Sequence, residues 1–366
     1  MPGYRNVCKT VPEVGLSVFL RIGPFVHGEV RNGGFPDWII EREKEGMAIR
    51  CNNEEYLGYV RRFWKKVYAQ VDGCMEKDGG PVIGIQIENE YGHVGGLQGP
   101  EGEAHIRTLT AMAKEIGFDV PLYTATGWGG ACIGDLLPVM GGYCEAPWDQ
   151  RTCEIEPNAN FVFSHTRNDA LIACDHHVEN ANSYNEEDFP FLTAELGGGL
   201  QVTMHRRPVA KGCDVGAMST VKMGSGAGLL GYYMYHGGSN PKGKLSTLQE
   251  SRATGYLNDL PEINYDFNAP IRQYGTISDS YREIKLLALF LNDFGEDMAS
   301  LRSEIPTIRI LPGDMHTVRT ACRHDADHGY VFFNNYQRRW KMDDHPQVKL
   351  EGLWMERRAW DFRHLT

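Results

Sequence analysis

Short apolar runs alternate with amphipathic segments along most of the chain. Several runs are apolar at adjacent positions, which is typical of strands buried on both faces of a parallel sheet. The predicted strands are residues 16–22, 82–87, 121–126, 139–144, 191–194 and 229–234.

Two segments between these strands have the spacing of amphipathic helices. Asn53 is a candidate N-cap for the first helix, and Gly117 is a candidate terminator of the second. The apolar stripe of the first helix consists of Leu57, Val60, Phe63, Trp64, Val67 and Val71. The stripe of the second consists of Ile106, Leu109, Met112, Ala113 and Ile116. We therefore predict an α/β fold in which helices cover a parallel sheet.

The strand ends favour one α/β architecture over another. Clusters of glycine, polar and acidic residues follow the strands, where a (β/α)8 TIM-type barrel places its active site. A doubly wound sheet is the alternative, but no G-x-G-x-x-G opens a helix after a strand. We predict a catalytic (β/α) barrel over residues 1–300 and the start of a β-rich accessory domain over 301–366. The short β-like runs of this second part are residues 308–311, 316–320 and 329–333.

Composition narrows the classes of function. The 366 residues are 42% hydrophobic and 23% charged, a globular balance that excludes disordered, collagen-like and coiled-coil chains. The net charge of −11 argues against nucleic-acid binding, and no apolar stretch approaches the ~18 residues of a membrane span. The 42 glycines and 11% aromatic residues suit a carbohydrate site, but composition alone favours the alternative of a large core with many tight loops. The nine cysteines form no CxxC pair, so their spacing indicates neither a zinc site nor a dense disulfide scaffold.

Carboxylates follow three of the predicted strands. Glu29, Glu90 and Glu195 are each followed by glycine within a few residues. A single glutamate at such a position is ordinarily a surface or capping residue, but three of them at strand ends indicate a site. Glu90 and Glu195 lie on different strands and are placed to face each other across a barrel mouth. Glycosidases need two such carboxyl groups beside the scissile bond.

Four long motifs resemble those of the glycoside hydrolase family 35 β-galactosidases, in order and in spacing. The resemblance extends over roughly residues 12–295. The motifs are RIGPFVHGEVRNGGFPDW (21–38), QIENEYG (86–92), GYYMYHGGSN (231–240) and YDFNAP (265–270). The resemblance implies a retaining exo-glycosidase that hydrolyses terminal non-reducing β-D-galactose from oligo- or polysaccharides. The implied partner is a β-galactoside carbohydrate, and no metal or organic cofactor is implied because two carboxylates and water suffice.

The resemblance also implies roles for individual residues. Glu90 matches the acid/base and Glu195 the nucleophile. Asn89 matches a residue that binds the sugar 2-OH and Tyr265 a sugar-contacting tyrosine, while Gly28 and Glu29 match an Ala-Glu pair that binds the 3-OH and 4-OH. Glu88, two residues before Glu90, is given a supporting or structural role.

The chain departs from the family pattern at several positions. It has Val30 where the family has a tryptophan, and glycines at 197–199 where familiar members are aromatic-rich. The segment 205–208 (HRRP) is a candidate lining of an acceptor site or a basic surface cluster. Residues 16–22 align with the third barrel strand, so the first two strand-helix units of the barrel are expected to be missing.

Two alternatives to a β-galactosidase stay open. In the first, the chain is a sugar-binding or inert fragment of such an enzyme. In the second, it is an enzyme that carries out the same chemistry on another β-glycoside. Family members are often secreted, periplasmic or lysosomal, and the sequence leaves the compartment, the natural glycan and the oligomeric state undecided.

Overall fold

The chain forms two compact units whose segments interleave along the sequence. The structure is a computed structural model that describes residues 3–125, 130–169, 182, 184–244, 247–250, 259–350 and 360–365. Unit 1 consists of Met1–Met140, His176–Phe189 and Pro241–Glu262. Unit 2 consists of Gly141–Asp175, Pro190–Asn240 and Ile263–Thr366. Among the described helices, none combines the length and apolar character that a membrane span needs.

A parallel sheet forms the framework, and its strand order β1-β2-β3-β4-β5 follows the sequence. Within unit 1, β1 to β4 pair in parallel, strand after strand. A curled parallel sheet of this order, with helices between its first and second and between its second and third strands, is part of a (β/α)8 barrel, as the hydrophobic pattern predicts. The strands are β1 Val18–Arg21, β2 Val82–Asn89, β3 Leu122–Ala125, β4 Leu137–Gly142 and β5 Thr193–Leu196.

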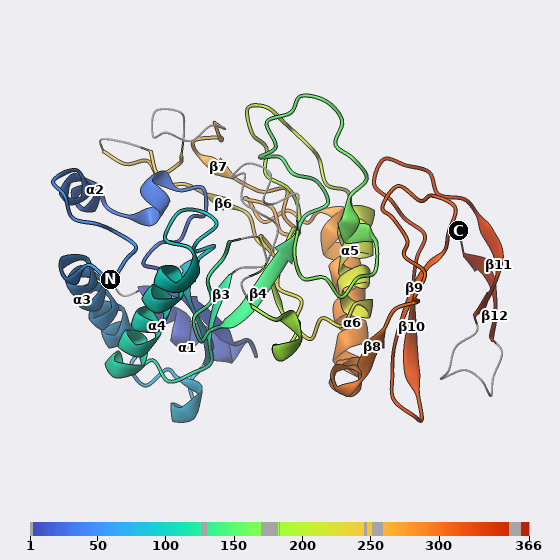
Figure 1. The fold of residues 1–366 in the computed structure, drawn as a ribbon, viewed down its shortest axis with the longest axis horizontal. Helices are drawn as coiled ribbons and strands as arrows, with labels where there is room; N and C mark the ends of the chain where they lie inside the picture. The colour runs from blue at the N-terminus through green and yellow to red at the C-terminus, as the bar shows by residue number, and fades with distance from the viewer. Residues whose placement is uncertain are drawn as a thin grey trace. The chain divides into compact units, whose positions relative to one another are not determined.

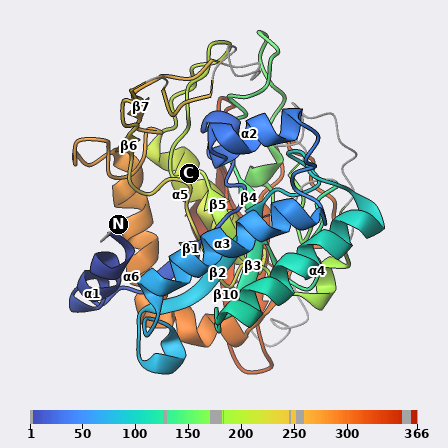
Figure 2. The same cartoon turned by 90° about the vertical axis from the view of Figure 1, so that its left-hand side faces the viewer.

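The helices of unit 1 cover the sheet. α3 and α4 lie side by side across strands β1 to β3 (Figure 2). Side chains from both layers form one core, in which Trp64 of α3, Leu109 of α4 and Ile85 of β2 are fully buried. The helical segments of unit 1 are α1 Gly3–Glu13, η1 Arg31–Gly34, α2 Asp37–Lys44, α3 Glu54–Val71, η2 Glu76–Asp78, α4 Gly99–Ile116 and η5 Glu186–Asp188.

The predicted ends of α3 and α4 are confirmed. The Asn53 side chain accepts a hydrogen bond of 3.0 Å from the Tyr56 backbone N–H, which caps α3. Gly117 ends α4 with φ 115°, a conformation that favours glycine. The α3 stripe was wrong at one position, because Phe63 is 50% exposed while Tyr56 is buried instead.

Unit 2 contains two long helices and a small antiparallel sheet. α5 (Gly212–Gly224) and α6 (Asp279–Ser300) lie side by side in Figure 1, and the sheet β10-β9-β8 packs against α5. Val221 and Met223 of α5 and Phe332 of β10 share one core cluster. The remaining elements of unit 2 are η3 Ala159–Phe161, β6 Gly238–Ser239, β7 Asn264–Tyr265, β8 Arg302–Glu304, β9 Arg319–His324, β10 Gly329–Asn334, β11 His345–Leu350 and β12 Trp360–Leu365.

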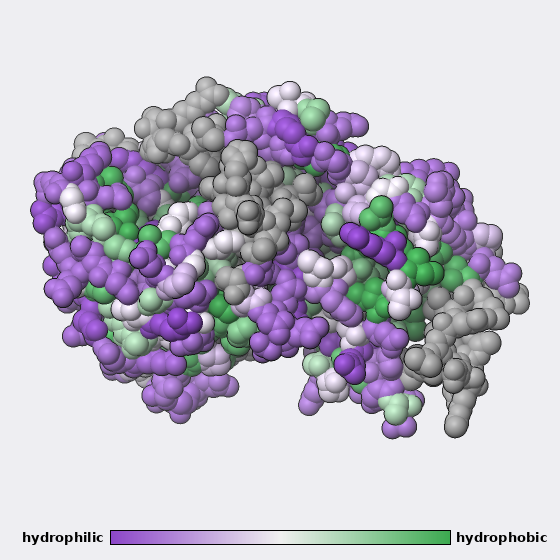
Figure 3. Space-filling view, in the orientation of Figure 1, coloured by the Kyte–Doolittle hydropathy of each residue, from purple (hydrophilic) through white to green (hydrophobic). Residues whose placement is uncertain are grey.

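Two predicted strands are replaced by other structure. Residues 308–311 form no strand, and Ile308 and Leu311 are exposed. Pro306 and Pro312 bracket this segment, and proline has no N–H to donate to a sheet. The segment lines a cavity of about 640 Å³, and apolar side chains gather on the face of unit 2 between α6 and β9 (Figure 3). Residues 229–234 form no strand and make two isolated bridges, Leu229 with Leu192 and Tyr232 with Leu196 of β5.

Candidate active site

β2 ends in a bulge that sets the direction of its last side chains. Its register against β3 shifts before Asn89, and Glu88 and Glu90 have positive φ angles of 57° and 47°. The backbone N–H of Glu88 donates to the Gly23 carbonyl, whereas that of Glu90 donates to the Ala125 carbonyl, both at 2.9 Å. Hydrogen bonds on both sides therefore hold this strained segment, and the two glutamates do not follow the alternation of a regular strand.

The side-chain amide of Asn89 is oriented by two donors. The Arg21 guanidinium and the Gln86 amide donate to its Oδ1, at 2.7 Å and 2.9 Å. A guanidinium only donates, so the atom that faces Arg21 is the carbonyl oxygen. The Nδ2 of Asn89 consequently lies on the side of Glu90, 3.3 Å from its Oε1. Both residues are buried, and an N–H donor therefore lies directly beside the Glu90 carboxyl group.

Glu88 enters the core and pairs with Arg50. Its Oε2 lies 2.8 Å from Nη2 of Arg50, and its side chain is fully buried. Arg50 also stacks over the Phe25 ring at 3.7 Å and donates to the Val94 carbonyl. Burial raises the pKa of Glu88, while the charge and hydrogen bond of Arg50 act in the opposite direction. This environment agrees with the supporting role predicted for Glu88.

Gly28 and Glu29 lie in a tight turn that a distant segment holds. His27, Gly28 and Glu29 have successive φ angles of 48°, 58° and 46°. The Glu29 carbonyl accepts a 3.0 Å hydrogen bond from the backbone N–H of Glu250 and a second one from the Gln249 side chain. These hydrogen bonds stabilise three consecutive residues in the left-handed region, which is unfavourable for residues other than glycine.

The carboxyl group of Glu250 lies in the electrostatic field of Glu29. Burial, and then the charge of Glu29, raise the pKa of Glu250 from 4.5 to about 8. Oε2 of Glu250 is buried and has no hydrogen-bond partner among the residues that the structure describes. The Glu250 carboxyl group therefore favours its neutral form at pH 7.

This pair predicts a pH dependence of stability. A raised pKa in the folded state means that Glu250 favours folding fully below about pH 4.5 and that this contribution is lost as the pH rises through about 8. We expect the melting temperature of the wild-type chain to fall, relative to that of Glu250→Gln, as the pH rises from about 5 to about 9. The exposed Glu41→Gln is the control, and it should follow wild type throughout. Parallel curves for wild type and Glu250→Gln would contradict the assignment.

In unit 2, Glu195 lies on β5 next to a tightly held strand end. The N–H of Leu196 donates to the Gly231 carbonyl at 2.9 Å, and the N–H of Gly197 donates to the Gly142 carbonyl at 2.8 Å. The residue is 7% exposed. Neighbouring backbone on both sides therefore fixes the point at which the Glu195 side chain leaves the sheet.

The glycines that follow Glu195 are required by close backbone approaches. A Cβ at Gly198 would lie 2.4 Å from the Met234 carbonyl oxygen, and one at Gly199 would lie 2.1 Å from the Asn268 carbonyl oxygen. Carbon atoms do not approach oxygen this closely, so no other residue fits without a shift of the backbone. Close packing of the backbone therefore explains why this chain has glycines at 197–199, where the family pattern is aromatic-rich.

Tyr265 belongs to an aromatic cluster. Its hydroxyl lies 2.6 Å from that of Tyr233, and the Phe267 ring packs against both rings with centroid distances of 5.9 Å and 5.3 Å. Tyr143 extends the cluster toward Trp148. Sequence reasoning missed Tyr233, although the aromatic-rich run 231–240 contains it.

Arg206 serves a structural purpose in unit 2. Its guanidinium lies 3.2 Å from Glu145 and also donates to the carbonyls of Arg151 and Cys153. Arg338 binds the same Glu145 carboxylate. Since Arg206 is buried, the segment 205–208 is not a simple basic surface cluster.

The predicted site residues are distributed over both units. Unit 1 holds Gly28, Glu29, Asn89 and Glu90, and unit 2 holds Glu195 and Tyr265. The structure brings Asn89 and Glu90 into contact, and it connects Tyr265 with Tyr233.

Comparison with known proteins identifies the family of the chain. A profile of the glycosyl hydrolases family 35 matches residues 4–290.

The chain belongs to glycosyl hydrolase family 35. It is 30% identical over 274 residues to beta-galactosidase 6 of Oryza sativa subsp. japonica, covering 74% of this chain and 26% of that relative. It is 28% identical over 280 residues to beta-galactosidase 17 of Arabidopsis thaliana, covering 74% of this chain and 35% of that relative. The match thus spans about a quarter to a third of these relatives.

All six predicted site residues of this family 35 chain fall inside the matched region. The structure adds residues that motif matching did not single out. Arg21 orients Asn89, while Gln249 and Glu250 hold the turn of Glu29. Gln249 and Glu250 follow Glu29 by more than 200 residues in the sequence, so no local pattern connects them with it.

Proposed function

We propose that the chain carries the catalytic machinery of a retaining exo-β-galactosidase. Glu90 is the acid/base and Glu195 the nucleophile, and the substrate is a terminal non-reducing β-D-galactose of an oligo- or polysaccharide. Family membership and the relatives named beta-galactosidases support this assignment. The observation that carries it is the oriented Asn89 amide beside the buried Glu90 carboxyl group.

The reaction proceeds by double displacement. Glu195 attacks the anomeric carbon while protonated Glu90 donates its proton to the leaving oxygen, which gives a covalent galactosyl-enzyme. Glu90, now ionised, takes a proton from water, and this water releases galactose from Glu195 with net retention of configuration. Such a mechanism requires carboxyl groups about 5–5.5 Å apart.

The surrounding residues supply substrate contacts. The Nδ2 of Asn89 donates to the sugar 2-OH, a contact that strengthens as charge develops in the transition state. The Glu29 carboxyl group accepts hydrogen bonds from the galactose hydroxyl groups. Tyr265 contributes a ring face and a hydroxyl group from its aromatic cluster.

A screen of aryl β-glycosides tests the proposal. The chain is expected to hydrolyse the β-galactoside at least about tenfold faster, in kcat/KM, than the β-glucoside or the β-glucosaminide. Fastest turnover of another β-glycoside would support the same chemistry on a different sugar. No turnover of any of them would overturn the proposal and leave a sugar-binding or inert chain, which galactose titration by calorimetry would distinguish.

The acid/base role of Glu90 predicts a dependence on the leaving group. Glu90→Ala should slow hydrolysis of a methyl β-galactoside by about 10²–10⁴-fold, and that of an activated dinitrophenyl β-galactoside far less in its first step. Glu88→Gln is not a suitable control because Glu88 belongs to the core, so the exposed Glu43→Gln serves instead. Equal loss on both substrates would show that Glu90 does not protonate the leaving group.

A further inference from the structure

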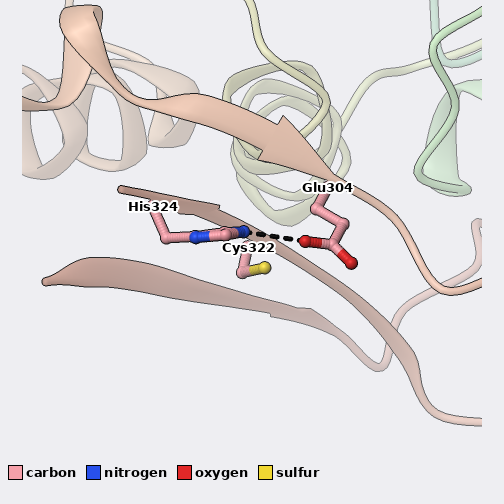
Figure 4. Close-up of side chains that lie close together, drawn as sticks. All are labelled: Glu304, Cys322 and His324. Carbon is pink, nitrogen blue, oxygen red and sulfur yellow. Dashed lines mark hydrogen bonds and ion pairs between the residues drawn. The ribbon is translucent and has the colours of Figure 1, made fainter. Parts of the chain in front are cut away.

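Three metal-ligating side chains converge on the sheet of unit 2, and none of them is a proposed active-site residue. Glu304 of β8 and Cys322 of β9 are direct cross-strand partners, and His324 lies two residues after Cys322 on the same face. Their ligand atoms all lie within 4.8 Å of one another. Figure 4 shows the three side chains pointing toward a common centre. Among the described residues, no other group of this kind occurs.

This face of the sheet is the one turned away from α5. Ala321 and Arg323, which alternate with the cluster residues, are buried, and Arg323 donates to the Met223 and Ala227 carbonyls at the end of α5. Cys322 and His324 are only partly buried. A solvated ion can therefore reach the cluster without any rearrangement of the core.

A hydrogen bond outside the cluster orients the imidazole of His324. Nδ1 lies 3.0 Å from the Asp325 carbonyl oxygen, which accepts only, so Nδ1 carries the proton. Nε2 then faces the cluster, 2.7 Å from Oε2 of Glu304. Metal-bound histidines characteristically donate their other ring N–H to a backbone carbonyl or carboxylate, because this fixes the tautomer that ligates.

We infer that Glu304, Cys322 and His324 form a zinc-binding site. Carboxylate, thiolate and imidazole are all zinc ligands, and water completes a tetrahedron. Bonds of about 2.0–2.3 Å place neighbouring ligand atoms roughly 3.3–3.8 Å apart. The three ligand atoms here lie within 4.8 Å of one another, so small side-chain movements bring them to that separation. On binding, the Cys322 thiol releases its proton to solvent, and Zn²⁺ replaces any proton shared by His324 and Glu304.

The ion would cross-link the edge of the sheet. β8 contains only three residues and pairs on one side, with β9. Zinc bound to both strands stabilises the folded state by an amount that rises with the logarithm of the free zinc concentration above Kd, because the unfolded chain does not hold the three ligands together. The cysteine spacing in the sequence conceals the site, since its ligands come from two strands instead of a CxxC loop.

Calorimetric titration of the tag-free, chelator-treated chain with Zn²⁺ tests this inference. We expect one equivalent to bind and the melting temperature to rise with it. Co²⁺ at the same site should produce a thiolate-to-metal charge-transfer band in the near ultraviolet. Cys322→Ser should abolish this band and weaken Zn²⁺ binding about tenfold or more, while circular dichroism shows whether the variant folds. Glu304→Gln should weaken binding without removing the thiolate band at saturating Co²⁺.

Matched variants separate this site from adventitious binding. Cys153 is an exposed cysteine and His316 an exposed histidine elsewhere, so Cys153→Ser and His316→Gln should bind Zn²⁺ as wild type does. If Cys322→Ser binds Zn²⁺ as tightly as wild type, or if the Co²⁺ band is absent from wild type, Glu304 and His324 form an ordinary ion pair and the inference is wrong.

Discussion

Replacing Glu195 with glutamine is expected to reduce β-galactoside hydrolysis by at least about 10⁴-fold. Glutamine keeps the size of the side chain, so the tightly held end of β5 should stay folded. It lacks the negative charge needed to attack the anomeric carbon, and no covalent intermediate can form. The loss should be similar for activated and unactivated leaving groups, unlike that of Glu90→Ala, because the first displacement itself is blocked.

Azide distinguishes the two carboxylates by the stereochemistry of its product. In Glu195→Gly, azide can occupy the space of the lost carboxylate and attack directly, which gives the α-galactosyl azide. In Glu90→Ala, azide attacks the galactosyl-enzyme formed on Glu195, which gives the β-galactosyl azide. Nuclear magnetic resonance of the products identifies the anomer. Products with exchanged configurations would reverse the two roles, and full activity of Glu195→Gln would exclude the nucleophile assignment.

The strands and helices of unit 1 are predictable because their patterns are local. The run 82–87 is apolar at nearly every position, and its burial on both faces follows from parallel pairing. The Asn53 cap and the Gly117 terminator act within one helical turn. By contrast, the apolar run 308–311 suggests a strand, yet it lies between prolines and has no strand to pair with.

The candidate site is predictable in its residues but not in its arrangement. Motifs identify Asn89, Glu90 and Glu195 by type and spacing, whereas the bulge at the end of β2 requires positive φ at two glutamates. Nothing in a glutamate residue indicates such a conformation. It exists because Gly23, just after β1, and Ala125 of β3 both bind this segment through their backbones, and pairing of this kind arises only in the folded sheet.

The ion pair between Arg50 and Glu88 is not predictable from a local sequence pattern. Arg50 precedes Glu88 by 38 residues and lies outside any helix or strand. Both side chains are buried, so each compensates a charge that would otherwise be unfavourable in the core. The pair also fixes the backbone next to Asn89, whose carbonyl lies 3.4 Å from the Arg50 guanidinium. The stability of the β2 bulge therefore depends on a residue that carries no motif.

Arg50→Met is expected to lower the free energy of unfolding by about 3–5 kcal/mol, because it leaves the Glu88 carboxylate buried without its cation. Glu88→Gln in the same chain should restore part of this loss, since a neutral amide needs no counter-charge. Full recovery is not expected, because Arg50 also stacks on Phe25 and donates to Val94. Urea unfolding of wild type, both single variants and the double variant measures the coupling energy.

The exposed pair of Arg61 and Glu115 provides the matched control. Its N–O distance is also 2.8 Å, but the side chains are 41% and 59% exposed. Solvent screens such a pair, and Arg61→Met should change the free energy of unfolding by no more than about 1 kcal/mol. If Arg50→Met had an effect as small as this, or if the Arg50 and Glu88 substitutions were additive, the buried ion pair would not hold the end of β2. The orientation of Asn89 beside Glu90 would then depend on Arg21 and Gln86 alone.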